Sequence, residues 1–139
     1  MAETFIFNLS RKTRPNTLRA GNQMISANDR MHHHVKAQIT SYLRRQPHEL
    51  YANTFDDMPR FNTENPCIVT INVKPPTRRR MDAPNWYPTV KALVDGFVDE
   101  GYLSDDNNGI IKETRFKSTD LSHTSEYILE ITFEEVDDA

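Results

Sequence analysis

The chain is poor in the residues that mark several classes of protein. It has a single cysteine, Cys67, which excludes an internal disulfide and favours a reduced, cytoplasmic setting. It has only four glycines, and they form neither a phosphate-binding loop nor a nucleophile elbow. It contains no apolar run of about 18 residues, so we expect no membrane span. Its first residues also lack the basic-then-apolar order of a secretory signal. We therefore expect one soluble domain over residues 1–139, with Cys67 in its core.

Acidic and basic residues are distributed unevenly along the chain. Residues 1–45 hold eight Lys or Arg and two Asp or Glu, whereas residues 93–139 hold three and thirteen. The net charge of −3 conceals this asymmetry. A basic half can bind a polyanion and an acidic half can gather divalent metal ions, although both patterns are also typical of ordinary solvated surface.

The hydrophobic pattern predicts four strands, at residues 4–9, 67–74, 109–118 and 126–136. With two helices between them, the order of elements is β-α-β-α-β-β. This order predicts an α/β (α+β-like) fold, in which a small mixed sheet packs against the two helices.

Capping residues and prolines predict where the two helices begin and end. The first helix is expected to end at Pro47. The second is expected from about Pro88 to Glu100, because proline suits a first helical turn and Gly101 suits the end of a helix. The candidate N-caps of the first helix are Ser26, Asn28 and Asp29.

Three aspartates flank the second expected helix. Asp82 precedes it, and Asp105 and Asp106 follow it. Carboxylates from separate loops suit Mg²⁺, which keeps several waters and needs only one or two protein carboxylates. The alternative is structural, because Asp and Asn also favour turns and Asp82 is equally suited to cap the helix.

Lys91 lies at the edge of the apolar stripe of the second expected helix. A lysine at that position can lie along the core and extend its ammonium past the rim, where it would contact a phosphate or a leaving oxygen. The alternative is an ion pair with Asp95, four residues further along the helix.

Three consecutive arginines, Arg78–Arg80, follow the double proline at positions 75 and 76. The prolines favour an extended backbone, so we expect the three guanidiniums to splay apart. Arginine binds phosphate bidentately, and the aromatic residues Trp86 and Tyr87 follow closely. This combination suits DNA with exposed or distorted bases, although Trp86 is also suited to cover the end of the helix.

The histidine run His32–His34 resembles a metal site in composition only. Adjacent residues of a helix point about 100° apart, so we expect that three in a row do not bind one ion.

The block of residues 78–111 resembles the RusA family of Holliday junction resolvases. The family pattern is an arginine-rich run, D-x-D-N, a helix bearing K-x-x-x-D, a glycine, and a D-D pair before a strand. A weaker similarity extends over most of the chain and includes the segment 26–32, as in phage and actinobacterial members. The matching residues are Arg78–Arg80, Asp82, Asn85, Lys91, Asp95, Gly101, Asp105 and Asp106.

The resemblance implies a homodimeric endodeoxyribonuclease, of phage or prophage type, that resolves four-way DNA junctions with Mg²⁺, for which Mn²⁺ is a possible substitute. It implies that Asp82, Asp105 and Asp106 bind the metal, and that Asp82, Lys91 and Asp106 are catalytic. A nuclease acting on forks or flaps, and a non-catalytic protein that binds branched DNA, remain alternatives. The expected DNA-binding residues are Arg14, Arg19, Arg30, Arg78, Arg79, Arg80 and Asn85.

The chain departs from the family pattern in two ways. Pro84 stands where the family has a second aspartate, and Asn85 lies further from Lys91 than in enteric members. A helix of 13 residues also spans about 20 Å, which would separate Asp82 from Asp106. The site is therefore expected to need a loop that folds back, or a second subunit.

Overall fold

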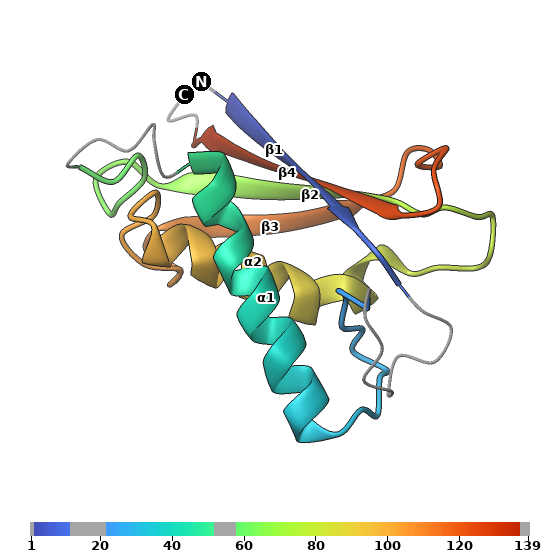
Figure 1. Cartoon of the computed structure of the whole chain (residues 1–139). Coiled ribbons are helices and arrows are strands. Elements are labelled where there is room, and N and C mark those ends of the chain that lie inside the picture. The colour runs from blue at the N-terminus through green and yellow to red at the C-terminus, as the bar shows by residue number, and fades with distance from the viewer. Residues whose placement is uncertain (1, 12–21, 52–57, 137–139) are drawn as a thin grey trace.

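The computed structural model describes residues 2–11, 22–51 and 58–136. Within these residues the elements follow the order β-α-β-α-β-β, and a short 3-10 helix precedes the second α-helix, so the predicted fold is confirmed (Figure 1). The elements are β1 (Ala2–Leu9), α1 (His33–Tyr51), β2 (Cys67–Lys74), η2 (Ala83–Trp86), α2 (Tyr87–Asp99), β3 (Ile111–Lys117) and β4 (Tyr127–Glu135).

The four strands form one mixed sheet in the order β1-β4-β2-β3. Strand β4 pairs antiparallel with both β1 and β2, whereas β3 pairs parallel with β2. The parallel pair is connected by α2, as a parallel connection requires a crossover. Because β2 and β3 run parallel, the segments before and after α2 lie toward opposite ends of these two strands (Figure 1).

Both helices cover one face of the sheet (Figure 1). Alternate residues of the central strands are buried on that face, including Ile71 of β2 and Ile131 of β4. The next pair along these strands, Asn72 and Glu130, points to the opposite face, where the Asn72 amide donates a hydrogen bond to the Glu130 carboxylate. The alternation explains why the strands were recognisable in the sequence, since residues two apart share a face. No described helix is long and apolar enough to cross a membrane.

Aromatic residues fix the turn that follows α2. Tyr102 is fully buried, and its ring packs against Phe97 and Phe133 at centroid distances of 5.4 and 5.0 Å. Its hydroxyl donates a hydrogen bond of 2.8 Å to Glu3 of β1. Phe61 donates its backbone N–H to the Tyr102 carbonyl at 3.2 Å. The start of the loop between α2 and β3 is thereby anchored in the core.

The prediction that the first helix ends at Pro47 is wrong, because α1 continues through it to Tyr51. Pro47 is buried against α2, where Gly96 provides the space. A Cβ at position 96 would lie 2.8 Å from Pro47 Cγ and 2.3 Å from the Arg44 carbonyl oxygen. The close approach of the two helices therefore holds a proline inside the helix, despite its missing N–H.

The predicted N-caps of the first helix are also wrong. The helix begins at His33, and the backbone N–H of His34 donates to Nδ1 of His32 at 3.2 Å. Asp29 instead accepts a hydrogen bond of 2.8 Å from the backbone N–H of Ser26 and forms an ion pair with Arg11. Asp29 does not cap the helix because its carboxylate pairs with Arg11, which lies far away in the sequence.

Candidate active site

Lys91 lies between two carboxylates in the first half of α2. Its ammonium donates hydrogen bonds of 2.6 Å to Asp95, one helical turn away, and of 2.6 Å to Asp106, in the following loop. The proposed ion pair with Asp95 is therefore present, and it does not exclude a contact with the loop. The structure brings together two of the residues that the sequence proposed as catalytic.

The loop that carries Asp106 is braced by its own side chains. Asp105 accepts a hydrogen bond of 2.8 Å from the backbone N–H of Asp106, and Asn107 accepts one of 2.9 Å from that of Gly109. Side chains that bond to neighbouring backbone groups are typical of tight turns. Asp105 thus shows the turn geometry that the sequence left open, and its bond to the backbone orients the next residue.

The braced loop folds back along α2. Because Asp106 contacts Lys91, the fifth residue of α2, it does not lie beyond the end of that helix. The separation of about 20 Å expected for a fully extended arrangement is therefore not required. One chain places a loop carboxylate next to the first half of the helix without help from a second subunit.

The charges of this cluster stabilise one another. Hydrogen bonding to Asp106 and then to Asp95 raises the pKa of Lys91, and the bond from Lys91 lowers the pKa of Asp106. Lys91 is therefore protonated at neutral pH, and it can stabilise negative charge but cannot act as a general base. The two pKa changes have the same cause, the partly exposed ion pair of Lys91 and Asp106, so they count once toward the stability of the fold.

Asp82 lies outside this cluster. It is the exposed N-cap residue of η2, but its side chain makes no capping hydrogen bond to the backbone of that helix. Within residues 2–11, 22–51 and 58–136, the only three metal-ligand side chains that lie close together are His32–His34. The structure therefore does not gather Asp82, Asp105 and Asp106 into one site.

A cleft of about 150 Å³ opens beside Lys91 and Asp106. Tyr87, at the start of α2, lines it and is 50% exposed. Asn108 lines it from the loop, and valines from β2 and α2 form an apolar part of its wall. The cleft thus places a cation, a carboxylate and an exposed aromatic ring together, and the cation and the ring are groups that can bind a nucleotide.

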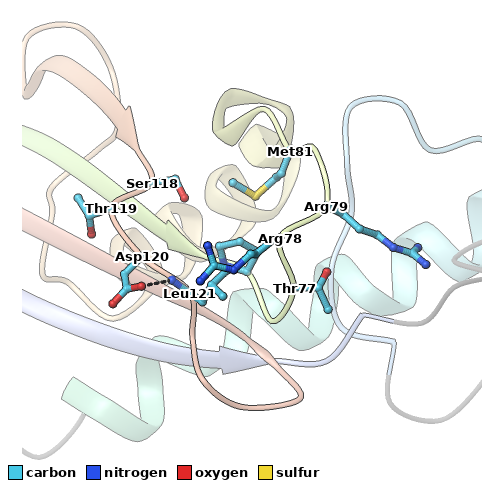
Figure 2. A pocket seen from close by; sticks show the side chains of 9 residues that line it. Thr77, Arg78, Arg79, Met81, Ser118, Thr119, Asp120 and Leu121 are labelled. Carbon is cyan, nitrogen blue, oxygen red and sulfur yellow. Dashed lines mark hydrogen bonds between the residues drawn. The ribbon is translucent and has the colours of Figure 1, made fainter.

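The three consecutive arginines lie on the segment that enters η2. All three are exposed, and no ion pair within the described chain involves them. Arg78 and Arg79 both line a pocket of about 350 Å³ with Asp120 and Leu121, but their side chains extend away from each other (Figure 2). These two guanidiniums therefore splay apart, as the sequence predicted for the run of three. Asp120 would repel a phosphate from the first pocket.

Arg79 and Arg80 line a second groove, of about 460 Å³, between the 75–86 segment and the segment before α1. Asn85 lies in this groove, and its carbonyl accepts a hydrogen bond of 2.7 Å from the backbone N–H of Ala27. Asp82 lines it too, which leaves that carboxylate beside the arginines. This groove suits a nucleic-acid backbone, because exposed guanidiniums bind phosphate.

The floor of the arginine groove is a packed ion pair. Arg11 donates to Asp29 at 2.7 Å, and the two side chains are only 16% and 7% exposed. The Arg11 guanidinium also lies 5.2 Å from the ring centre of Trp86. Trp86 is buried and packs against Tyr127, so it covers the start of the helix, as one interpretation of the sequence proposed.

The remaining proposed residues are scattered. Arg30 is exposed in the segment before α1. Arg14 and Arg19 lie outside the described residues, and their contact with DNA stays a prediction. Cys67 is fully buried, and its burial raises the pKa of the thiol to about 12, which confirms it as a core residue.

Sequence reasoning missed two contributors. Asp95 was recognised as an ion-pair partner of Lys91 and as part of the K-x-x-x-D motif but was given no role in the site, although its i,i+4 spacing identifies it as a neighbour of any group that Lys91 contacts. The pair of Arg11 and Asp29 had no local signal, because residues 12–28 separate its members along the chain.

Comparison of the chain with protein-family models and with curated proteins finds no match. The resemblance to the RusA family therefore rests on the motif residues of the 78–111 block.

Proposed function

We propose that the protein is a Mg²⁺-dependent endodeoxyribonuclease that resolves four-way DNA junctions. The observation that carries the proposal is the contact of Lys91 with Asp106, on a chain whose segment before the same helix lines a separate groove with Arg79 and Arg80. These residues come from one motif block, and they supply the cation, carboxylate and phosphate-binding groups that phosphodiester hydrolysis requires.

In this proposal, the arginine groove holds the DNA backbone and the cleft beside Lys91 holds the phosphate to be cut. The Lys91 ammonium stabilises the charge that develops on the phosphate and on the leaving oxygen. Because Lys91 is already held by two carboxylates, little reorganisation is needed when the phosphate arrives. Tyr87 provides an exposed ring on which a displaced base can stack.

The carboxylates beside Lys91 fit Mg²⁺. Lys91 uses one oxygen of Asp95 and one of Asp106, so each keeps a second oxygen as a metal ligand. Two carboxylates with several waters are a typical magnesium donor set. When bound, Mg²⁺ would activate water and neutralise charge on the phosphate. Neither Asp105 nor Asp82 gathers with this pair within the described residues, so each would bind the metal only if the DNA, a loop movement or a second subunit brought it closer.

We infer a homodimer because a four-way junction is resolved by two symmetric cuts. Two identical sites related by a two-fold axis match the symmetry of the junction. The proposed setting is cytoplasmic, with branched DNA as the partner.

The test is cleavage of a labelled four-way junction with Mg²⁺ or Mn²⁺. We expect paired nicks from the wild type, and binding without cleavage from Asp106→Asn. Glu113→Gln is the matched control, because Glu113 is an exposed carboxylate whose partner is Arg115 on the same strand. Cleavage by Asp106→Asn at the wild-type rate would exclude the proposed site. A fork, a flap and a duplex as substrates would identify a related nuclease with another preference.

A non-catalytic protein that binds branched DNA is the second candidate. It is favoured by the position of Asp82, away from Asp106, and by Pro84 in place of the second aspartate. This candidate predicts tight binding of the junction and no product with either metal.

A further inference from the structure

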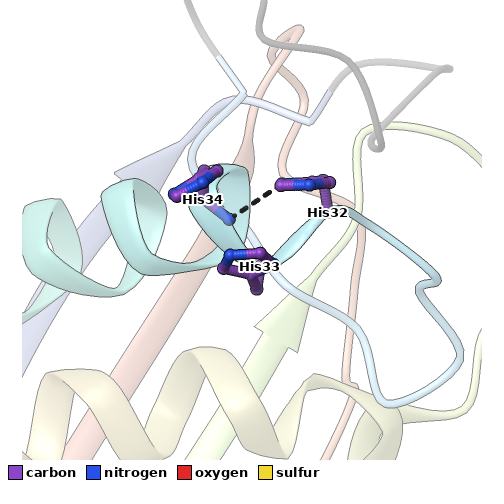
Figure 3. Close-up of side chains that lie close together, drawn as sticks. All are labelled: His32, His33 and His34. Carbon is purple, nitrogen blue, oxygen red and sulfur yellow. Dashed lines mark hydrogen bonds between the residues drawn. The ribbon is translucent and has the colours of Figure 1, made fainter.

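The exposed histidines His32, His33 and His34 form a cluster at the start of α1 (Figure 3). Their ring centres lie 4.1 to 4.8 Å apart, and their candidate ligand nitrogens all lie within 4.8 Å of one another. The sequence-based expectation of diverging rings is wrong in its geometry, because α1 begins only at His33. His32 lies outside the helix, and its ring turns back over the first turn.

This cluster differs from the other described histidines. His48 pairs with Glu100 at 2.7 Å, and His123 lies 3.5 Å from Asp120. In contrast, the structure shows no carboxylate paired with the three clustered rings within the described part of the chain. Three neutral imidazoles that lie close together, with no carboxylate paired to them, can together bind one cation from solution through their nitrogen lone pairs.

We infer that His32, His33 and His34 form a binding site for a divalent transition-metal ion of the Zn²⁺ class. Imidazole nitrogen suits Zn²⁺, Ni²⁺ and Cu²⁺, whereas Mg²⁺ prefers oxygen ligands. Tetrahedral coordination with Zn–N distances near 2.05 Å places the nitrogens about 3.4 Å apart. Ring rotation about exposed side-chain bonds supplies the required closure. Three protein ligands leave a fourth position for water or a group from a partner.

The surroundings determine the selectivity of the site. Arg30 and Lys36 flank the cluster, and a helix N-terminus also disfavours a cation. Binding must therefore rest on coordination by nitrogen, so an ion held mainly by charge, such as Mg²⁺, is excluded. This requirement separates the histidine site from the carboxylates around Lys91.

Metal binding also competes with a local hydrogen bond. Nδ1 of His32 accepts the backbone N–H of His34, so the proton of that ring lies on Nε2. Coordination through Nε2 moves the proton to Nδ1, and coordination through Nδ1 displaces the N–H. In either case the cap is lost, and the first turn of α1 is expected to change when metal binds.

The test is titration of the whole protein with ZnCl₂ in competition with a chromophoric chelator. We expect one Zn²⁺ per chain, at least tenfold weaker binding for each of His32→Ala, His33→Ala and His34→Ala, and no displacement by excess Mg²⁺. The matched control is His123→Asn, because His123 is exposed and has φ 59°, a conformation that asparagine tolerates. Its affinity should equal that of the wild type.

Imidazole ¹H–¹⁵N spectra give a second readout that does not depend on affinity. We expect the resonances of three rings to shift on addition of Zn²⁺, and Asp106→Asn to bind Zn²⁺ normally even if it no longer cuts DNA. Absence of binding, binding retained by all three alanine variants, or loss of Zn²⁺ binding in Asp106→Asn would each overturn the inference.

Discussion

Two charged regions lie on or next to η2 and α2, and they differ in whether their charged side chains form ion pairs. Around Lys91, one ammonium is paired with two carboxylates, those of Asp95 and Asp106, at 2.6 Å each. Along residues 78–80, the three guanidiniums are exposed, and no described carboxylate pairs with them. The cluster of Lys91, Asp95 and Asp106 (the paired cluster) is held in place before any ligand arrives, whereas the unpaired arginines are available to a polyanion. The difference suggests a division between a site for chemistry and a surface for binding.

The largest expected effect concerns the paired cluster. Lys91→Met removes the cation while keeping the length of the side chain, and we expect cleavage to fall about 10²–10³-fold, as for the loss of one stabilising donor. Junction binding should change little, because the arginine groove remains. Single-turnover cleavage and gel binding separate the two quantities. A large loss of binding with unchanged cleavage would reverse the division between the regions.

The next effect tests the helix that supports both regions. Gly96→Ala places a Cβ 2.3 Å from the Arg44 carbonyl oxygen, and backbone cannot move aside easily. We expect unfolding free energy to fall by about 1–3 kcal/mol in urea denaturation. Gly109→Ala is the control, because its nearest atom is the side-chain oxygen of Asn107 at 3.1 Å. An equal effect of both changes would contradict the importance of the α1–α2 contact.

A smaller effect concerns the unpaired arginines. Arg80→Ala should weaken junction binding several-fold and reduce the slope of log affinity against log salt by about one, because one phosphate contact is lost. Arg44→Ala changes the net charge equally, but Arg44 already pairs with Asp99 at 2.9 Å. It should leave the slope unchanged. Equal slopes for both variants would mean that paired and unpaired arginines contribute alike.

The smallest effect is the pH dependence of the paired cluster. The bond from Lys91 lowers the pKa of Asp106 in the folded protein, so this pair stabilises the fold above the ordinary aspartate pKa near 4. The contribution is lost as pH falls through the folded-state pKa. The pair is partly exposed, so we expect at most about 1 kcal/mol. Unfolding of the wild type and Asp106→Asn from pH 6 to 2 should show a stability difference that shrinks with acid.

Local patterns predicted most of the fold. The alternation of apolar residues in β4 and the stripe of α2 marked those elements, because period and face are properties of neighbouring residues. The failures had distant causes. Pro47 stays inside α1 because Gly96, on another helix, makes room, and Asp29 leaves its expected cap because Arg11 takes its carboxylate.

The candidate site divides in the same way. Motif and spacing alone identified Lys91, Asp105, Asp106 and the three arginines as candidate site residues, because the type of a side chain determines whether it can bind metal or phosphate. Only the tertiary structure decided that the loop folds back to bring Asp106 onto Lys91 while Asp82 stays beside the arginine groove. It also decided that the three histidines meet, because α1 begins at His33. Sequence determines the groups that a chain carries, whereas the path of loops packed on a core determines which of them touch.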